Sequence, residues 1–154
     1  MFSMLLFVKF VHVIAAMVFF GLPFAFGRWY AVCLHTSHAD TLHETLRRMK
    51  TFTFLHLNLC ALILIITGLY LGITMGLWPK AIWLHISLTL SILAIINLNA
   101  NLGLALKKLH SYMPELPDEQ ALRATRKRII IFSALHHTFV TLSVALMIFK
   151  PQMG

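Results

Sequence analysis

The chain has 154 residues, of which 59% are apolar and 12% are charged, and its formal net charge is +8. A soluble domain of this size averages about 45–50% apolar and about 25% charged residues, and it cannot hide such an excess in one small core. The composition therefore excludes an ordinary soluble domain and favours a protein surrounded by lipid.

Four apolar stretches are each long enough to cross a membrane. They cover residues 4–26, 51–75, 81–106 and 129–149, and each holds the roughly 20 residues that span about 30 Å of hydrocarbon. Lys9 is the only formally charged side chain within them, so no stretch has the charged stripe of a water-facing helix. The first stretch lacks the flanks of a cleaved signal peptide, so we expect it to be retained. The sequence predicts an all-α fold, a transmembrane four-helix bundle that forms a single domain over residues 1–154.

The basic residues predict which side of the membrane each connection faces. Two connections, after the first and after the third stretch, carry most of them: Arg28, Arg47, Arg48, Lys50, Lys107, Lys108, Arg123, Arg126, Lys127 and Arg128. Only Lys9, Lys80 and Lys150 would face the other side. By the positive-inside rule both long loops are cytoplasmic and both chain ends are outside, as in a multi-pass protein of the bacterial inner membrane. The partner of these charges is then anionic lipid, and no nucleic acid is expected.

The connections themselves show some expected structure. Residues 37–50 are polar and are predicted to be partly helical. The turn at residues 76–80 is so short that the second and third spans should be antiparallel neighbours. In the second cytoplasmic loop, a short amphipathic helix is expected to begin near Asp118, after Pro117, and to lead into the fourth span.

Histidines inside the spans are the most unusual feature of the sequence. There are five, and every span has at least one: His12, His56, His85, His136 and His137. An ionisable ring in hydrocarbon needs a partner and therefore indicates a functional site. Counting about 1.5 Å per residue gives an outer pair, His12 with His85, and an inner pair, His56 with His136 or His137. Because adjacent helical residues point about 100° apart, only one of the last two can face a given site.

Paired histidines on facing helices are a common way to hold b-type haem in a membrane. We therefore predict His12, His85, His56 and His137 as iron ligands for one or two haem groups that carry electrons within or across the bilayer. In the second span, His56 and Thr67 fall on one helical stripe, which would face this site. The structural alternative is that the histidines form hydrogen bonds with Asn58, Asn97, Asn99 and Asn101.

Other classes of function are open at this point. Soft thioethers favour Cu(I), and several methionines lie near the outer surface: Met1, Met4, Met75, Met147 and Met153. A copper-handling protein, or a non-catalytic subunit of a respiratory complex, is therefore an alternative. Cys33 and Cys60 lack the spacing of a redox or zinc pair. The spans contain no Asp or Glu, which argues against a carboxylate-based pump.

Several short motifs resemble those of one known group of membrane haem proteins. The residues VKFVHVIA at 8–15 resemble the opening helix of bacterial protoporphyrinogen oxidases of the HemJ type and of the related copper-resistance protein D family. Trp83-Leu84-His85 resembles the start of their third helix, and further matches in order and spacing cover nearly the whole chain: Arg47-Arg48, Arg128 and Phe149-Lys150-Pro151. The resemblance implies haem b in a helix bundle, with His12 and His85 at the matching ligand positions. Lys9 matches a lysine that the oxidases carry one turn before their histidine.

The chain departs from the oxidase pattern at two places. Ser87 stands where the oxidases carry a lysine, two residues after the third-helix histidine. In the fourth span, residues 132–137 read FSALHH where the oxidases have an Asn-Glu-x-Pro stretch. These departures favour an electron carrier over a haem-dependent protoporphyrinogen oxidase, which is kept as an alternative. A chain this small also needs a redox partner, so we expect a quinone, a membrane or periplasmic protein, a homodimer or a larger complex.

Overall fold

The computed structural model describes residues 2–35, 39–78, 80–102 and 119–151. Within these ranges it contains helices and turns and no strand. Four helical segments are long and apolar enough to cross a membrane: Ser3–Phe26, Arg47–Thr74, Ile82–Ala100 and Arg126–Phe149. The predicted all-α fold with four spans is therefore confirmed. The end of the third predicted span, residues 103–106, lies outside the described residues.

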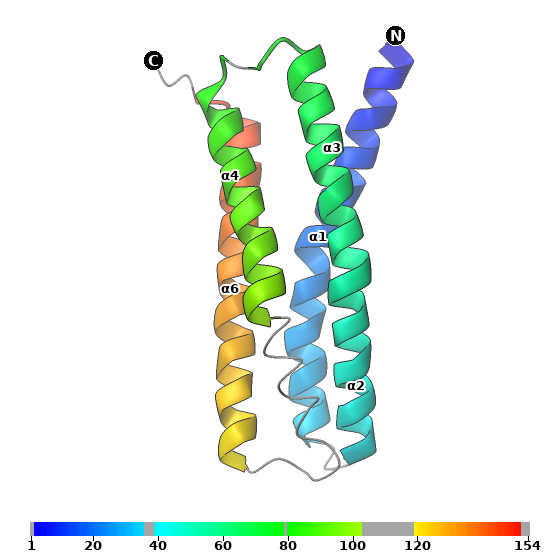
Figure 1. Cartoon of the computed structure of the whole chain (residues 1–154), viewed down its shortest axis with the longest axis vertical. Helices are drawn as coiled ribbons and strands as arrows, with labels where there is room; N and C mark the ends of the chain where they lie inside the picture. The colour runs from blue at the N-terminus through cyan, green and yellow to red at the C-terminus, as the bar shows by residue number, and fades with distance from the viewer. Residues whose placement is uncertain (1, 36–38, 79, 103–118, 152–154) are drawn as a thin grey trace.

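The helices follow the predicted order along the chain. The first is α1 (Phe2–His35) and the last is α6 (Glu119–Phe149). Between them, α2 (Ala39–Thr51), the π-helical segment η1 (Phe52–Leu57) and α3 (Asn58–Thr74) form one continuous rod, and α4 (Ile82–Ile96) continues into the π-helical segment η2 (Asn97–Leu102). Figure 1 shows that the beginning of α1 and the end of α6 lie at the same end of the bundle.

The structure shows helix in both connections for which the sequence predicts it. The polar segment before the second span is the helix α2, and α6 begins at Glu119, one residue after the expected Asp118. α2 is amphipathic and leads into the second span without a break. The candidate cap at residues 37–38 lies outside the described residues.

The bundle consists of two helix pairs that also contact each other. α1 packs most extensively on α3, and α4 on α6 (Figure 1), and α1 also packs on α6. The end of the bundle where α1 begins, which the positive-inside rule assigns to the outside, is called the outer end, and the opposite end is called the inner end. At the outer end α3 approaches α4 so closely that a Cβ atom on Gly72 would lie 2.9 Å from Leu84 Cδ2. In the inner half, Asn58 and Asn99 exchange two amide hydrogen bonds of 2.9 and 2.8 Å.

A tight turn joins α3 to α4, as its length predicted. Gly76 has a positive φ of 66°, a conformation that glycine adopts without strain. The Leu77 amide then donates to the Gly72 carbonyl at 2.9 Å and satisfies one of the carbonyls at the end of α3. This turn fixes the two helices as antiparallel neighbours.

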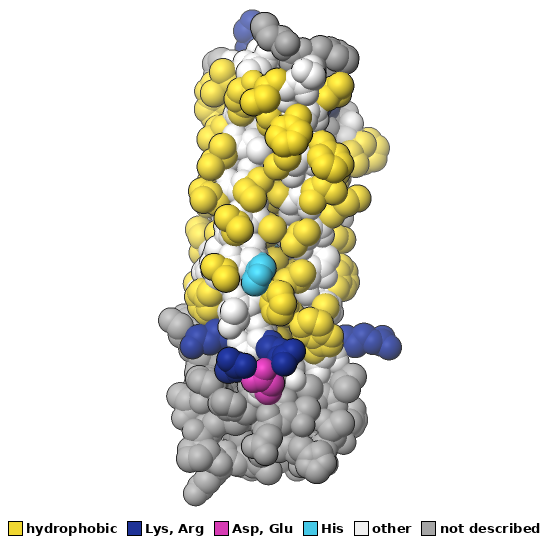
Figure 2. Space-filling view, turned by 90° about the vertical axis from the view of Figure 1, so that its right-hand side faces the viewer, with side chains coloured by type: hydrophobic (Ala, Val, Ile, Leu, Met, Phe, Trp, Pro, Cys, Tyr) yellow, Lys and Arg dark blue, Asp and Glu magenta, His cyan; other side chains and the backbone are white. Residues whose placement is uncertain are grey.

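The best-packed core lies in the inner half of the bundle. Side chains from all the helices there are almost inaccessible to solvent: Phe26, Met49, Leu57, Leu98 and Ile129. The outer face of the bundle is apolar over most of its length, as Figure 2 shows for one side, where a single histidine stands above a group of charged residues. An apolar surface of this height is what lipid requires.

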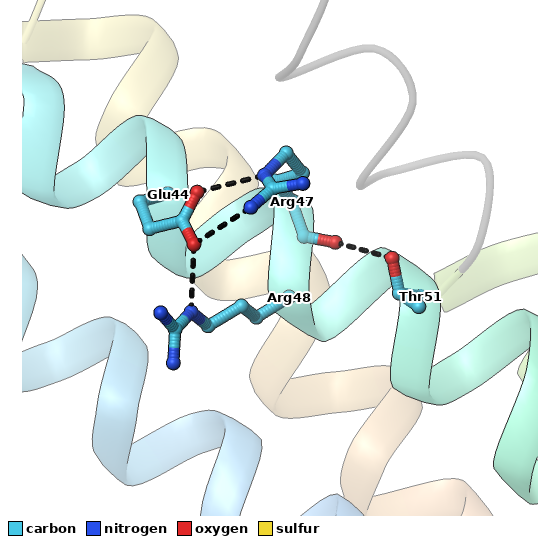
Figure 3. Close-up of polar contacts among 4 residues, drawn as sticks. All are labelled: Glu44, Arg47, Arg48 and Thr51. Atoms are coloured by element: carbon cyan, nitrogen blue, oxygen red, sulfur yellow. Dashed lines mark hydrogen bonds and ion pairs between the residues drawn. The ribbon is translucent and has the colours of Figure 1, made fainter.

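The charged residues on that side include a small network on α2. Glu44 accepts hydrogen bonds from Arg47, at 2.7 and 2.9 Å, and from Arg48, at 2.8 Å, and the Thr51 hydroxyl donates to the Arg47 carbonyl (Figure 3). The bonds from Arg47 and then Arg48 lower the pKa of the Glu44 carboxyl to about 2. The network lies at the end of the bundle that the positive-inside rule assigns to the cytoplasm.

Candidate functional site

One ring nitrogen of His12, on α1, forms an interhelical hydrogen bond, and the other is available to a ligand. Its Nδ1 lies 2.7 Å from Thr67 Oγ1 on α3. The Thr67 hydroxyl has a single hydrogen, which it donates to the Ile63 carbonyl at 2.6 Å, so the Thr67 oxygen must accept from His12. His12 is therefore the Nδ1–H tautomer, and its Nε2 carries the lone pair that binds a metal ion.

Gly68 allows His12 to lie close against α3. A Cβ atom at this position would be 3.3 Å from Cε1 of the imidazole. That separation is shorter than ordinary van der Waals contact, so a larger residue would require the ring to shift by a few tenths of an ångström. Thr67 and Gly68 are consecutive, and together they hold the ring and set its tautomer.

A cavity opens beside His12 in the outer half of the bundle. It contains about 760 Å³ of empty space, part of it continuous with the outside. All four spans contribute to the wall, which is mainly apolar and carries few polar groups: His12, Trp78, Ser91 and Ser143. Phe19, Ala61, Ile95 and Val140 belong to the same lining.

His85 is near this cavity but is not part of its lining. It lies in the first turn of α4, half-buried, and its ring centroid is 4.2 Å from the Trp78 ring. Its helical neighbours Leu84 and Leu88 face the cavity instead. Of the predicted outer pair, His12 thus lines the cavity, whereas His85 packs on Trp78, which lines it.

The predicted inner pair does not share a site in the described structure. His56 is exposed on the outer face of η1, where its ring packs on Phe52 at 4.7 Å. His137 lies against α1, with its ring centroid 3.7 Å from Phe24 and 5.3 Å from Phe20. The two histidines thus have separate surroundings, one facing outward and one between α1 and α6.

His137 nevertheless has the hydrogen bonding of a potential ligand. Its Nδ1 donates to the Ser133 carbonyl one turn earlier in α6, which leaves the lone pair on Nε2. This Nε2 is buried, and none of the described residues forms a hydrogen bond with it. Phe20 and Phe24 pack against the ring. The role of His137 as an iron ligand stays a prediction.

The burial of His136 has a structural explanation, which His137 lacks. Pro23 interrupts α1 and, having no N–H, leaves the Phe19 carbonyl without its helical partner. His136 is buried, and its Nε2 donates to this carbonyl at 3.0 Å. In lipid an unpaired carbonyl is costly, so His136 replaces the hydrogen bond that the proline removes.

A cluster of three serines links α4 to α6 beside the cavity. Ser87 Oγ lies 2.9 Å from the Ser143 carbonyl and 2.7 Å from its hydroxyl, and Ser91 Oγ lies 3.1 Å from the same hydroxyl. Ser87 is fully buried, whereas Ser91 and Ser143 line the cavity. From the sequence, Ser87 could be recognised only as a departure from the oxidase pattern. A serine in a membrane helix indicates no particular role until its hydrogen-bond partners are known.

His12, His136 and His137 have other hydrogen-bond partners than the asparagines of the structural alternative. Asn58 and Asn99 bond each other, and Asn97 donates to the Phe132 carbonyl at 2.8 Å. The hydrogen bonds of His12, His136 and His137 go to a threonine and to backbone carbonyls. The side chain of Asn101 lies outside the described residues.

The remaining candidate residues are dispersed. Lys9 is half-buried one turn before His12. Met4 and Met75 are exposed, Met147 lines the cavity, and Met1 and Met153 lie outside the described residues. Cys60 is a free thiol packed against the core. Among the described residues, no group of three or more His, Cys, Asp or Glu side chains is arranged to hold a metal ion.

The comparison with protein families agrees with a membrane protein. The family model described as "Predicted integral membrane protein (DUF2269)" matches residues 6–151. The chain belongs to this family. No curated protein and no solved structure matches the chain. The DUF2269 description establishes an integral membrane protein and names no cofactor.

Proposed function

We propose that this DUF2269 protein is a membrane b-type haem protein that carries electrons within the bilayer, with His12 as an axial ligand of the iron. The observation that carries the proposal is the fixed tautomer of His12 beside a cavity. Thr67 takes the Nδ1 hydrogen, and the lone pair of Nε2 is left for a metal. In metal sites, a ligating histidine almost always donates its other ring hydrogen in this way.

The cavity lining suits a largely apolar group, because all four spans contribute apolar side chains to it. On the α3 side of the cavity, Gly68 lets the His12 ring pack closely against the helix. The sequence resemblance to haem-binding families, which rests in part on the segment around His12, independently supports the same cofactor.

The protein's own residues would orient the group and exclude water. Thr67 and Gly68 position His12, and the apolar wall keeps the site dry. Haem, when bound, supplies a one-electron couple, whose potential the axial ligand and the surrounding polarity set. Because the outer half of the bundle is surrounded by lipid, the electron donor is a lipid-soluble quinol or another membrane protein.

The arrangement of Ser87 favours a carrier over an oxidase. At the position where the resembling oxidases have a lysine, Ser87 is buried and bonded to Ser143. It therefore joins two helices and does not offer a charge to a substrate. The inner histidines are not needed for this proposal, and one haem in the outer half is sufficient.

The test is purification from haem-replete cells, followed by reduced-minus-oxidised spectra and an iron-to-protein ratio. We expect a b-type spectrum that His12→Ala abolishes. His56→Ala is the matched control, since it makes the same substitution at an exposed histidine. A colourless wild-type protein, or an unchanged spectrum in well-folded His12→Ala, overturns the proposal. Copper without iron would favour the copper alternative.

A further inference from the structure

His137 holds an unbonded hydrogen-bond acceptor near the middle of the bilayer. Its Nδ1 donates to the Ser133 carbonyl, so the lone pair lies on Nε2. This Nε2 is buried, and no described residue forms a hydrogen bond with it. The two ends of its span, Arg126 and Phe149, are 11 and 12 residues away, or about 16–18 Å at 1.5 Å per residue. A group that bonds this nitrogen must therefore reach the middle of the hydrocarbon.

The His137 ring lies against aromatic side chains of α1 that face the lipid. Its centroid is 3.7 Å from that of Phe24 and 5.3 Å from that of Phe20. Phe24 is 59% exposed, and an exposed side chain within a span faces lipid. Gly21, between the two phenylalanines in the sequence, has open space beside it, because an added Cβ would meet nothing within 4 Å. This stretch of α1 thus offers aromatic faces and room next to an unbonded acceptor.

Ring contacts also connect His137 with the cavity beside His12. Phe19 lines that cavity, and its ring centroid is 4.8 Å from that of His136. The ring centroids of His136 and His137 are 5.7 Å apart. Both separations are within the range of about 4.5–7 Å in which neighbouring rings pack on each other. A molecule bound at His137 is therefore joined to the cavity wall by a continuous series of packed rings.

We infer that the lipid-facing surface beside Phe24 and His137, where α1 packs on α6, binds a lipid-soluble quinol, one hydroxyl of which donates a hydrogen bond to His137 Nε2. A quinol is neutral and flat, so it reaches the middle of the bilayer and stacks on phenylalanine rings. Glycerolipids and fatty acids keep their polar ends at the surface, because burying an unpaired polar group is costly. Binding breaks no covalent bond, and it uses the lone pair that iron ligation by His137 would need, so these two roles exclude each other. The role of the quinol rests on the proposed function, because a haem electron carrier needs a reductant.

The experiment compares a quinol with a compound that cannot donate a hydrogen bond. Tetramethyl-1,4-benzoquinol and its dimethyl ether have the same ring, but the ether has no hydroxyl hydrogen. Calorimetric titration of the detergent-solubilised protein measures each affinity, and full reduction of the protein beforehand prevents electron transfer. We expect the quinol to bind about 2- to 10-fold more tightly than the ether, as for one hydrogen bond. In protein labelled with ¹⁵N-histidine, the quinol and not the ether should shift the Nε2 resonance of His137.

Variants separate the hydrogen bond from the surrounding packing. His137→Leu removes the acceptor, so the preference for the quinol over the ether should disappear, whereas His56→Leu, the same substitution at an exposed histidine, should keep it. Gly21→Leu fills the open space and should weaken the binding of both compounds.

Two results would overturn the inference and leave the haem proposal intact. One is equal affinity of the wild type for the two compounds, and the other is a preference that survives in His137→Leu. If His137→Leu does not fold, the wild-type Nε2 resonance decides, and a resonance that the quinol leaves unchanged counts against the site. A protein that shows the preference but contains no haem overturns the proposed function and leaves the binding site.

Discussion

His136 donates a hydrogen bond of 3.0 Å from its Nε2 to the carbonyl oxygen of Phe19. The carbonyl is available because Pro23, four residues later in α1, has no N–H to offer. α6 thus completes a hydrogen bond that α1 cannot form by itself. The pairing gives a structural reason for the nearly complete burial of His136.

This relationship predicts a strong energetic coupling between Pro23 and His136. His136→Leu should lower the free energy of unfolding by about 1–3 kcal/mol, because it leaves the Phe19 carbonyl unpaired. In a Pro23→Ala background the new N–H satisfies that carbonyl, so the same substitution should cost much less. Unfolding of the four proteins in detergent measures the cycle, and simple additivity of the two changes would contradict it.

Thr67 should control how firmly haem is held. Thr67→Val keeps the shape of the side chain but removes the acceptor for His12 Nδ1, so the tautomer is no longer fixed. Loss of such a supporting group typically weakens metal affinity about 10- to 100-fold. Haem per protein, measured after dilution, should fall accordingly. Thr67→Ser retains the hydroxyl and serves as the control, and equal haem retention in the valine variant would refute this role.

Gly68 should be sensitive to the smallest possible substitution. Gly68→Ala places a Cβ atom 3.3 Å from His12 Cε1, so the ring must shift from its hydrogen bond with Thr67. We expect reduced haem content and an altered spectrum. Gly21→Ala is the control, because no atom lies within 4 Å of its added Cβ, and it should stabilise α1 by up to about 1 kcal/mol. Indistinguishable spectra for the two variants would show that the Gly68 contact is unimportant.

The four spans could be predicted from the sequence because hydropathy reports directly on the solvent of a helix. The turn at Gly76 and the helix α2 were likewise predictable from local signals. The surroundings of each histidine were not, because they depend on which face of each helix turns inward. Counting residues placed His12 in the outer half but could not show that Thr67 would accept its hydrogen.

The helical face predicted for the second span shows most clearly what the sequence could not predict. His56 and Thr67 were expected on one face, on the assumption of a uniform 3.6-residue period. η1 is π-helical from Phe52 to Leu57, so the rotation per residue changes within that stretch. In the structure Thr67 bonds His12 in the interior, whereas His56 is exposed. Pro23 and His136 give a second case, since their relationship joins residues that are distant in sequence.

The reciprocal amide pair of Asn58 and Asn99 should also behave as a unit. Each single leucine substitution leaves one buried amide without its partner, whereas the double substitution removes both. Interhelical hydrogen bonds in membranes average about 0.6 kcal/mol and reach about 1.7 kcal/mol. We expect a coupling energy in that range from unfolding of the two single variants and the double variant. A coupling indistinguishable from zero would mean that the pair does not join α3 to η2.

The network around Glu44 predicts an unusual acid titration. Because Arg47 and Arg48 lower the pKa of Glu44 from 4.5 to about 2, the folded state holds its carboxylate more firmly than the unfolded chain does. The contribution to stability is therefore complete above pH 4.5 and is lost as the pH falls toward 2. Carboxyl NMR of the protein in detergent should show Glu44 titrating near the lower value. Replacing both arginines by glutamine should return the midpoint to the ordinary range, and an ordinary midpoint in the wild type would show that the ion pairs do not persist in solution.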